Sequence, residues 1–371
     1  MAQYRMLGAG DPAPLFRQRC TSNEDYNFDT VAGRYIVLCF FATAGDAHGR
    51  RMLKVLEDHR ELFDDRHIAL FGVSMDPRDE QQQRVRESLP GIRHFWDFNH
   101  QIGRLYGASP LEPQKGPVRF RRQWMVLDPD MRIRAVFPSI ADAGEVPALM
   151  DCLMNLPPVG LHGGVRVHAP VIILPRVFEP EFCTELIGLY DAHGGEDSGF
   201  MRDVDGKTTL IKDYHHKRRS DYLIEDEALK SRLQQKVTRR VVPEIRKIHQ
   251  FEVTRMERYI VARYDSATRD HFNAHRDNTT KGTAHRRFAM SVLLNDDYEG
   301  GELSFPEYGN QPIRGPAGTA IIFSFSLLHA VSPVSRGQRY VFLPFLYDDA
   351  AAAIREANNA YLDEKVGQYR R

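Results

Sequence analysis

The stretch that decides the fold of the second half of the chain is GTAIIFSFSLLHAVSPVSRGQRYVFLPFLY, residues 318–347. Its apolar run, rich in Ile and Phe, predicts a buried strand that delivers His329. The segment SPVSRG then predicts a turn, and a second strand is expected to begin near Arg339. A guanidinium there is suited to bidentate pairing with a carboxylate, which would belong to a cosubstrate.

Upstream, the stretch HFNAHRDN contains a second pair of candidate ligands, His275 and Asp277. On an extended strand, residues i and i+2 point to the same side, so both side chains can reach one ion. Together with His329 they supply two imidazoles and one carboxylate, the ligand set of non-haem Fe(II) oxygenases. We therefore expect His275, Asp277 and His329 to be the metal ligands and the catalytic centre. A lone H-x-D pair recurs by chance, so the ordered set carries the prediction.

In order and spacing, residues 259–347 resemble the prolyl 4-hydroxylase-like family of Fe(II)/2-oxoglutarate dioxygenases. The matching features are Tyr264, the H-x-D pair, LNDDYEGGEL at 294–303, an apolar strand at 318–325 and the pattern HAVSPVSRGQRY at 329–340. The resemblance implies a double-stranded β-helix, a jelly-roll whose two sheets enclose the metal.

The same resemblance implies the cofactors and the reaction. Fe(II) would bind 2-oxoglutarate and O2, and an aliphatic C–H bond would be hydroxylated with release of succinate and CO2. Arg339 would hold the far carboxylate of the cosubstrate, Tyr264 would add a hydroxyl contact, and ascorbate is expected to stimulate turnover. Related halogenases lack the carboxylate ligand, so Asp277 argues against halogenation. Some members carry Tyr where this chain has Leu293, so the carboxylate clamp is expected to differ in detail.

The segment IKDYHHKRRSDYLI, residues 211–224, is basic, and its RRSDYL resembles the family's segment near the substrate entrance. It predicts a substrate lid formed by His216, Arg218, Arg219 and Tyr222. The alternative is a solvated basic loop, which is what most charge clusters are. As a lid, the segment would favour an acidic or carboxylate-bearing substrate.

The first half of the chain has a different pattern. YIVLCFFA and HIALFGVSM predict buried strands, GRRMLKVLEDHRELF between them has helical spacing, and RRQWMVLD with MRIRAVFP predicts a hairpin. Alternating strands and helices indicate an α/β layer fold. From about residue 10 to residue 153 this half resembles thioredoxin-like proteins of the peroxiredoxin branch.

The redox chemistry of that branch is not expected here, because it needs a thiolate at the start of the helix after the first strand. The loop 42–49 contains no cysteine: Gly45 and His48 stand where C-x-x-C members carry their sulfurs, although Arg122 matches the arginine that peroxiredoxins keep. Cys39 lies inside an apolar run and is expected to pack in the core. We therefore expect a redox-inactive domain that recognises a partner, extends the substrate channel or mediates self-association, for example as a homodimer.

Two domains are expected, 1–158 and 159–371, with the seam in the Pro- and Gly-rich stretch NLPPVGLHGGVRVHAP. Helices predicted at 179–194, 226–249 and 348–369 would flank the β core. Fifty basic and fifty acidic residues leave a formal charge of zero, which does not favour a nucleic-acid partner. Four scattered cysteines and the absence of a long apolar run favour a cytoplasmic protein without membrane attachment.

Three functions remain open from the sequence. The first is an Fe(II)/2-oxoglutarate dioxygenase that hydroxylates an amino-acid-derived metabolite or a peptidyl residue. The second is desaturation or cyclisation at the same iron, since the outcome depends on substrate placement. The third is a non-enzymatic, redoxin-type binding module with a vestigial oxygenase half. The intact ligand set favours the first two.

Overall fold

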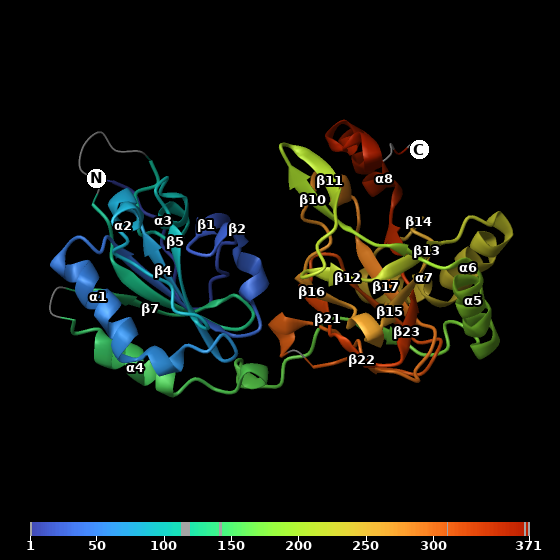
Figure 1. Cartoon of the computed structure of the whole chain (residues 1–371), viewed down its shortest axis with the longest axis horizontal. Coiled ribbons are helices and arrows are strands. Elements are labelled where there is room, and N and C mark those ends of the chain that lie inside the picture. Colours follow the sequence, from blue (N-terminus) through green and yellow to red (C-terminus); the bar gives the residue numbers. More distant parts are fainter. Residues whose placement is uncertain (1, 113–118, 141–142, 310, 367–368, 370–371) are drawn as a thin grey trace. The chain divides into compact units, whose positions relative to one another are not determined.

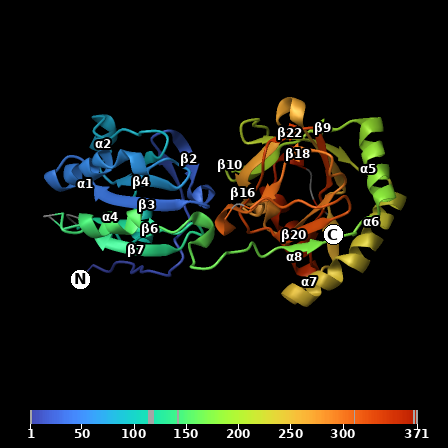
Figure 2. The same ribbon diagram turned by 90° about the horizontal axis from the view of Figure 1, so that it is seen from below.

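The computed structural model describes residues 2–112, 119–140, 143–309, 311–366 and 369 (Figures 1 and 2). The chain divides into two compact units, Met1–His168 with Pro306–Asn310, and Ala169–Phe305 with Gln311–Arg371. Among the described residues, none of the helices has both the length and the apolar character needed to cross a membrane.

The units divide after His168, later than the seam that the sequence predicts after residue 158. The intervening residues stay with the first unit because polar contacts hold them there. His162 Nε2 lies 3.6 Å from a carboxylate oxygen of Asp130, and the carbonyl of His162 accepts from Arg134 at 3.5 Å.

The first unit is built on one mixed sheet of seven strands, in the order β2-β1-β5-β4-β3-β6-β7. Strands β3, β4 and β5 run parallel, whereas β6 and β7 are antiparallel. The strands are β1 Arg17–Cys20, β2 Asn23–Asn27, β3 Tyr35–Ala42, β4 Ile68–Ser74, β5 Ile92–Trp96, β6 Gln123–Leu127 and β7 Ile133–Pro138. The predicted α/β layer fold is confirmed.

Strands β3 and β4 are buried along their whole length, so both faces of this sheet are covered. Met52 and Leu56 of one helix and Leu149 and Leu153 of another pack on the face of β3 that carries Val37. The helices are α1 Ala47–Asp58, α2 Pro77–Gln81, α3 Gln101–Leu105 and α4 Val146–Met154. Only α1 overlaps a helix that the sequence predicts, at residues 49–63.

The second unit consists mainly of antiparallel strands in two sheets. The larger sheet has nine strands, with the path β14-β24-β17-β23-β15-β13-β9 and with β20 and β8 branching from β17. Its strands are β8 Ile172–Leu174, β9 Glu196–Asp197, β13 Ser220–Leu223, β14 Arg255–Glu257, β15 Ile260–Asp265, β17 Phe288–Leu293, β20 Ala320–Ser324, β23 Gln338–Phe342 and β24 Phe345–Tyr347.

The smaller sheet has four strands in the order β12-β16-β21-β19. Two two-stranded sheets accompany it, the hairpin β10-β11 and the pair β18-β22. The strands are β10 Phe200–Val204, β11 Lys207–Ile211, β12 Lys217–Arg218, β16 His271–His275, β18 Glu299–Gly300, β19 Leu303–Ser304, β21 His329–Val331 and β22 Val334–Arg336. Two antiparallel sheets with flanking helices confirm the mainly β prediction for this half.

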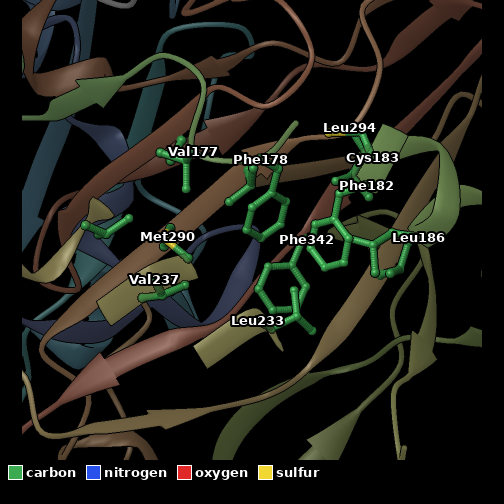
Figure 3. Packing of buried hydrophobic residues seen from close by; sticks show 14 of the residues in the cluster. Val177, Phe178, Phe182, Cys183, Leu186, Leu233, Val237, Met290, Leu294 and Phe342 are labelled. Atoms are coloured by element: carbon green, nitrogen blue, oxygen red, sulfur yellow. The ribbon is translucent and has the colours of Figure 1, made fainter. Parts of the chain in front are cut away.

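The hydrophobic core of the second unit lies between the nine-stranded sheet and its helices, α5 Pro180–His193, α6 Glu227–Arg240 and α7 Val242–His249. Figure 3 shows Phe182 of α5, Leu233 of α6 and Phe342 of β23 in this core. Because side chains alternate along a strand, Tyr340 and Phe342 face the helices and Arg339 faces the other side of the sheet. Core packing thereby fixes the direction of a predicted site residue.

Three details differ from the sequence predictions. The apolar run does not form one strand up to His329: β20 ends at Ser324, and His329 begins β21 of the other sheet. The segment expected to be a turn contains β22. The helix expected at 226–249 is two helices, because Pro243 lacks an N–H and begins a new helix. The closing helix is shorter, α8 Asp349–Ala357.

Candidate metal centre

The structure brings the three predicted ligands together on the four-stranded sheet. His275 ends β16 and His329 begins β21, and the two residues are directly paired in the antiparallel register. Asp277 follows β16, and its backbone N–H donates to the carbonyl of Phe325 at 3.3 Å. Neighbouring antiparallel strands place opposite side chains on one face, which is why residues far apart in sequence meet here.

The ligand atoms are close enough to share one ion. The Asp277 carboxylate lies 3.6 Å from Nε2 of His275 and 3.4 Å from Nε2 of His329, and all three ligand atoms lie within 4.8 Å of one another. Two donors that each stand about 2 Å from one metal can be at most about 4 Å apart, which fits the two histidine–aspartate distances. Two His and one carboxylate on one face suit Fe(II).

Both imidazoles are held in the orientation that a metal needs. Nδ1 of His275 contacts the carbonyl oxygen of Asn273 at 2.7 Å, and Nδ1 of His329 contacts that of Leu327 at 3.0 Å. A carbonyl oxygen can only accept, so Nδ1 carries the proton and Nε2 is left with its lone pair. Phe272 stacks on the His275 ring with centroids 3.4 Å apart, and this stacking limits rotation of the His275 imidazole.

The protonation states also suit metal binding. Burial, together with the nearby His329, lowers the pKa of His275 to about 4, so this imidazole is neutral at neutral pH. Burial alone would raise the pKa of Asp277, but its interactions with His275 and His329 outweigh that and hold the pKa well below the usual range. A neutral imidazole and an ionised carboxylate are the forms that bind metals.

Arg339 and Tyr264 lie opposite each other on β23 and β15 of the nine-stranded sheet. The Cζ atom of Arg339 is 5.1 Å from the centroid of the Tyr264 ring. Arg339 is only 2% exposed, and its Nε has no hydrogen-bond partner among the described residues. A Cβ on Gly301 would come within 2.9 Å of Arg339 Cδ, so the glycine leaves the arginine its space. A buried guanidinium without a carboxylate fits a site for an acidic ligand such as 2-oxoglutarate.

The segment predicted to be a lid is only partly a loop, at residues 212–216. It contains β12 of the smaller sheet and β13 of the larger one, so the chain passes between the sheets here. His216 lies 6.2 Å from the His275 ring, and Arg219 is buried and donates to the hydroxyl of Tyr264 at 3.3 Å. Arg218 and Tyr222, by contrast, are directed away from the metal centre.

The contacts of these two residues do not support a place for them in a lid. Arg218 is 43% exposed at its side chain and lies 3.7 Å from Asp270. Tyr222 stacks on His193 of α5 and packs against the core on the helix side of the larger sheet. The sequence reasoning also passed over Lys217, which is 4% exposed and lies beside Phe272. The alternation Lys217, Arg219, Asp221 was the available signal, because strand residues two apart share a face.

The first unit has no thiol where its redox relatives carry one. Arg122 instead donates to the Asp46 carboxylate at 2.5 Å, and His48 Nε2 contacts the hydroxyl of Ser139 at 2.9 Å. Cys39 is fully buried, and burial raises the pKa of its thiol well above the usual value. Since the thiolate is the reactive form, this cysteine is inert.

Comparisons with known proteins match both halves of the chain. Residues 259–347 match the 2OG-Fe(II) oxygenase superfamily, and residues 9–136 match the AhpC/TSA family. A PKHD-type hydroxylase of Polaromonas sp. (strain JS666 / ATCC BAA-500) is 41% identical over 88 residues, which are 21% of this chain and 38% of that protein. One of Synechococcus sp. (strain CC9902) is 36% identical over 100 residues, 26% of this chain and 40% of that protein. The two resemblances found in the sequence are confirmed.

The chain thus spans 38% and 40% of the length of these two curated relatives. Among solved structures, a prolyl hydroxylase of Trichoplax adhaerens, in complex with a hypoxia inducible factor peptide fragment, aligns with a TM-score of 0.40 and 15% identity. That alignment covers 57% of this chain and 96% of the other.

Proposed function

We propose that this chain is an Fe(II)- and 2-oxoglutarate-dependent hydroxylase. Residues 259–347 form its 2OG-Fe(II) oxygenase domain, and residues 9–136 form an AhpC/TSA-like domain. Its substrate would be an amino-acid-derived metabolite or a peptidyl residue with an aliphatic C–H bond. The observation that carries the proposal is the convergence of His275, Asp277 and His329, with both Nδ1 atoms tied to backbone carbonyls.

Each protein group has a definite task in this proposal. His275, Asp277 and His329 would hold Fe(II). Bound iron with 2-oxoglutarate supplies the oxidising chemistry that produces succinate and CO2. Arg339 would pair with the far carboxylate of 2-oxoglutarate, and Phe272 and Phe323 pack against the two imidazoles and exclude water from them.

The test begins with anaerobic reconstitution by Fe(II) and measurement of bound iron. Addition of air, ascorbate and labelled 2-oxoglutarate should then give slow succinate formation even without substrate. His275→Ala should lose stoichiometric iron and reduce succinate formation by about 100-fold or more, since ligands are needed as a set. No bound iron and no succinate in the wild-type protein would instead support the binding-module alternative.

His271→Ala is the matched control. His271 lies on the same strand, β16, but its ring contacts the carbonyl oxygens of Arg269 and His215 rather than the other ligands. Iron content and succinate formation should be unchanged in this variant. Equal losses in both variants would show that damage to β16, not removal of a ligand, causes the effect.

We also propose that the partner is a small molecule or a peptide rather than a nucleic acid. Equal numbers of basic and acidic residues support this. The first unit would then serve binding or self-association instead of redox chemistry, supported by the pairing of Arg122 with Asp46.

A further inference from the structure

Three cationic side chains of the second unit surround a single carboxylate, that of Asp221. Arg219 forms a bidentate pair with it at 2.6 and 2.7 Å, and Arg258 reaches it at 3.4 Å. Lys217 connects to it through Ser198, whose hydroxyl accepts from Lys217 at 2.8 Å and donates to Asp221 at 2.6 Å. We call Lys217, Arg219, Arg258 and Asp221 the Asp221 cluster.

The Asp221 cluster has more positive than negative charge. Other carboxylates nearby are committed elsewhere: Asp197 interacts with Lys212 at 3.4 Å and accepts from Tyr214 at 2.7 Å, and Asp277 belongs to the metal centre. Glu257, adjacent to Arg258 in sequence, accepts from other groups on the helix α8 side of the sheet. No carboxylate of the described residues lies within ion-pair distance of Lys217.

The cluster borders the metal centre but is separate from Arg339. The Lys217 ammonium lies 5.0 Å from the centroid of the Phe272 ring, and that ring stacks on His275. Both Lys217 and Arg258 interact electrostatically with the metal ligand Asp277. On the other side, Arg219 contacts the hydroxyl of Tyr264. A group bound at the cluster would therefore lie next to the place where oxidation occurs.

Buried cations without enough counter-charge are costly to a protein. Lys217 and Arg219 are 4% and 6% exposed. Burial lowers the pKa of Lys217 well below its usual value, which is the physical sign of this cost, whereas the side chain of Arg258 is 28% exposed. An anion beside them would offset it. Lys217 uses two of its three donors, on Ser198 and Gly199, so one donor remains for a ligand.

We propose that the substrate carries an anionic oxygen group, a carboxylate or a phosphate, which binds at the Asp221 cluster to Lys217 and Arg258. This inference rests on the proposed function and specifies its substrate class. Arg219, already engaged by Asp221, positions that carboxylate and Tyr264 rather than contacting the anion. The substrate's reacting carbon would be held near the metal by its charged end.

Arg218 provides a matched control for the test. It is adjacent to Lys217 and carries the same charge, but it is directed to the surface, where it lies near Asp270. Lys217→Gln and Arg218→Gln therefore make the same change in net charge, and only the first changes the cluster. Arg258→Gln gives a second cluster variant in case Lys217→Gln fails to fold, which circular dichroism would reveal.

The probes are matched pairs that differ in one charged group: N-acetyl-L-proline with N-acetyl-L-prolinamide, N-acetyl-L-leucine with its amide, and O-phospho-L-serine with L-serine. Binding is measured by calorimetry on full-length protein loaded with Mn(II) and saturated with 2-oxoglutarate, without oxygen. At least one anionic member should bind the wild-type protein about tenfold or more tightly than its neutral partner. The preferred pair distinguishes carboxylate from phosphate.

The preference should disappear in Lys217→Gln or Arg258→Gln and persist in Arg218→Gln, while the affinity for 2-oxoglutarate stays unchanged in all three. The inference is overturned if both members of every pair bind equally or if neither binds. It is also overturned if the cluster variants lose affinity for 2-oxoglutarate, because the cluster would then bind the cosubstrate. If Mn(II) and 2-oxoglutarate do not bind the wild-type protein, the proposed function fails. Binding of the probe pairs is then measured on the metal-free protein.

Discussion

The guanidinium of Arg339 is buried, and no carboxylate of the described residues forms an ion pair with it. Its side chain is directed away from the helices because Tyr340 and Phe342 occupy the core side of β23. Its Nε is without a hydrogen-bond partner among those residues, and the ring of Tyr264 lies beside its guanidinium. A protein tolerates such a residue when a ligand supplies the missing charge, since an unpaired buried cation costs several kcal/mol.

We predict that Arg339→Gln raises KM for 2-oxoglutarate by about 10- to 100-fold. Hydrogen bonds to charged groups contribute about 1.5–3 kcal/mol, and each 1.4 kcal/mol corresponds to about tenfold in affinity. The thermal stability of the apoprotein should not fall, because the variant removes an uncompensated charge. Steady-state succinate formation at varied 2-oxoglutarate concentrations measures the effect.

Arg336→Gln is the control for this prediction. Arg336 lies on β22, is 64% exposed at its side chain and pairs with Glu299 at the surface. The KM of Arg336→Gln for 2-oxoglutarate should equal that of the wild-type protein. An unchanged KM in Arg339→Gln would mean that another residue holds the cosubstrate.

Single residues also show what the sequence could reveal about the site. His275, Asp277 and His329 could be predicted because their order and spacing are fixed by the two strands that carry them. Lys217 could not be ranked in the same way, since it stands in a basic segment and such segments are usually solvated. Only the pairing of β12 with β16, between residues far apart in the chain, places Lys217 beside Phe272.

At the scale of elements, helix α8 is attached to the larger sheet through a buried carboxylate. Glu257 of β14 accepts from His285 at 3.1 Å, from Arg286 at 2.9 Å and from Arg355 of α8 at 2.7 Å. Burial alone would raise the pKa of Glu257, but Arg286, His285 and Arg355 outweigh burial and hold the pKa well below its usual value. These contacts explain why His285 is buried.

This network predicts that stability depends on pH. Because the folded-state pKa of Glu257 is depressed, its contribution is present above the unfolded-state pKa of about 4.3 and is lost as the pH falls below that value. Glu257→Gln should destabilise the second unit by about 3–5 kcal/mol at pH 7, since it leaves buried cations unpaired. The difference between variant and wild type should shrink below about pH 4. Urea unfolding followed by far-ultraviolet circular dichroism measures both quantities.

Glu252→Gln serves as the control, because Glu252 forms an exposed surface pair with Arg246. Surface pairs contribute little, so no measurable change is expected. A destabilisation by Glu257→Gln that stays the same from pH 7 down to about pH 3, well below the unfolded-state pKa, would contradict the assignment of the effect to the ionised carboxylate.

Elements differ in how far the sequence determines them. The strand predicted at YIVLCFFA is β3 without any shift, because an uninterrupted apolar run between polar ends has one solution in a buried parallel sheet. In contrast, the run before His329 crosses from the larger sheet to the smaller one at Phe325. Hydrophobicity cannot reveal this crossing, because both sheets bury their strands.

For the whole molecule, each unit has its own hydrophobic core, which is the property of a domain that can fold by itself. The chain has only two tryptophans, Trp96 and Trp124, and both are buried in the core of the first unit. The candidate metal ligands all belong to the second unit. Tryptophan fluorescence therefore reports on unfolding of the first unit, whereas metal binding should affect the second unit.

We predict that Mn(II) with 2-oxoglutarate raises the unfolding temperature of the second unit and leaves that of the first unchanged. A ligand at 100 times its Kd stabilises the state that binds it by about 2.7 kcal/mol. Since each kcal/mol shifts Tm by about 2–4 °C in a domain of this size, the expected shift is about 5–11 °C. Far-ultraviolet circular dichroism should show one transition that moves, while the tryptophan transition stays in place. In His275→Ala neither transition should move, because the ligand set is incomplete. An equal shift of the tryptophan transition would mean that both units unfold as one cooperative body, and the first unit would then have to be included in any account of cosubstrate binding.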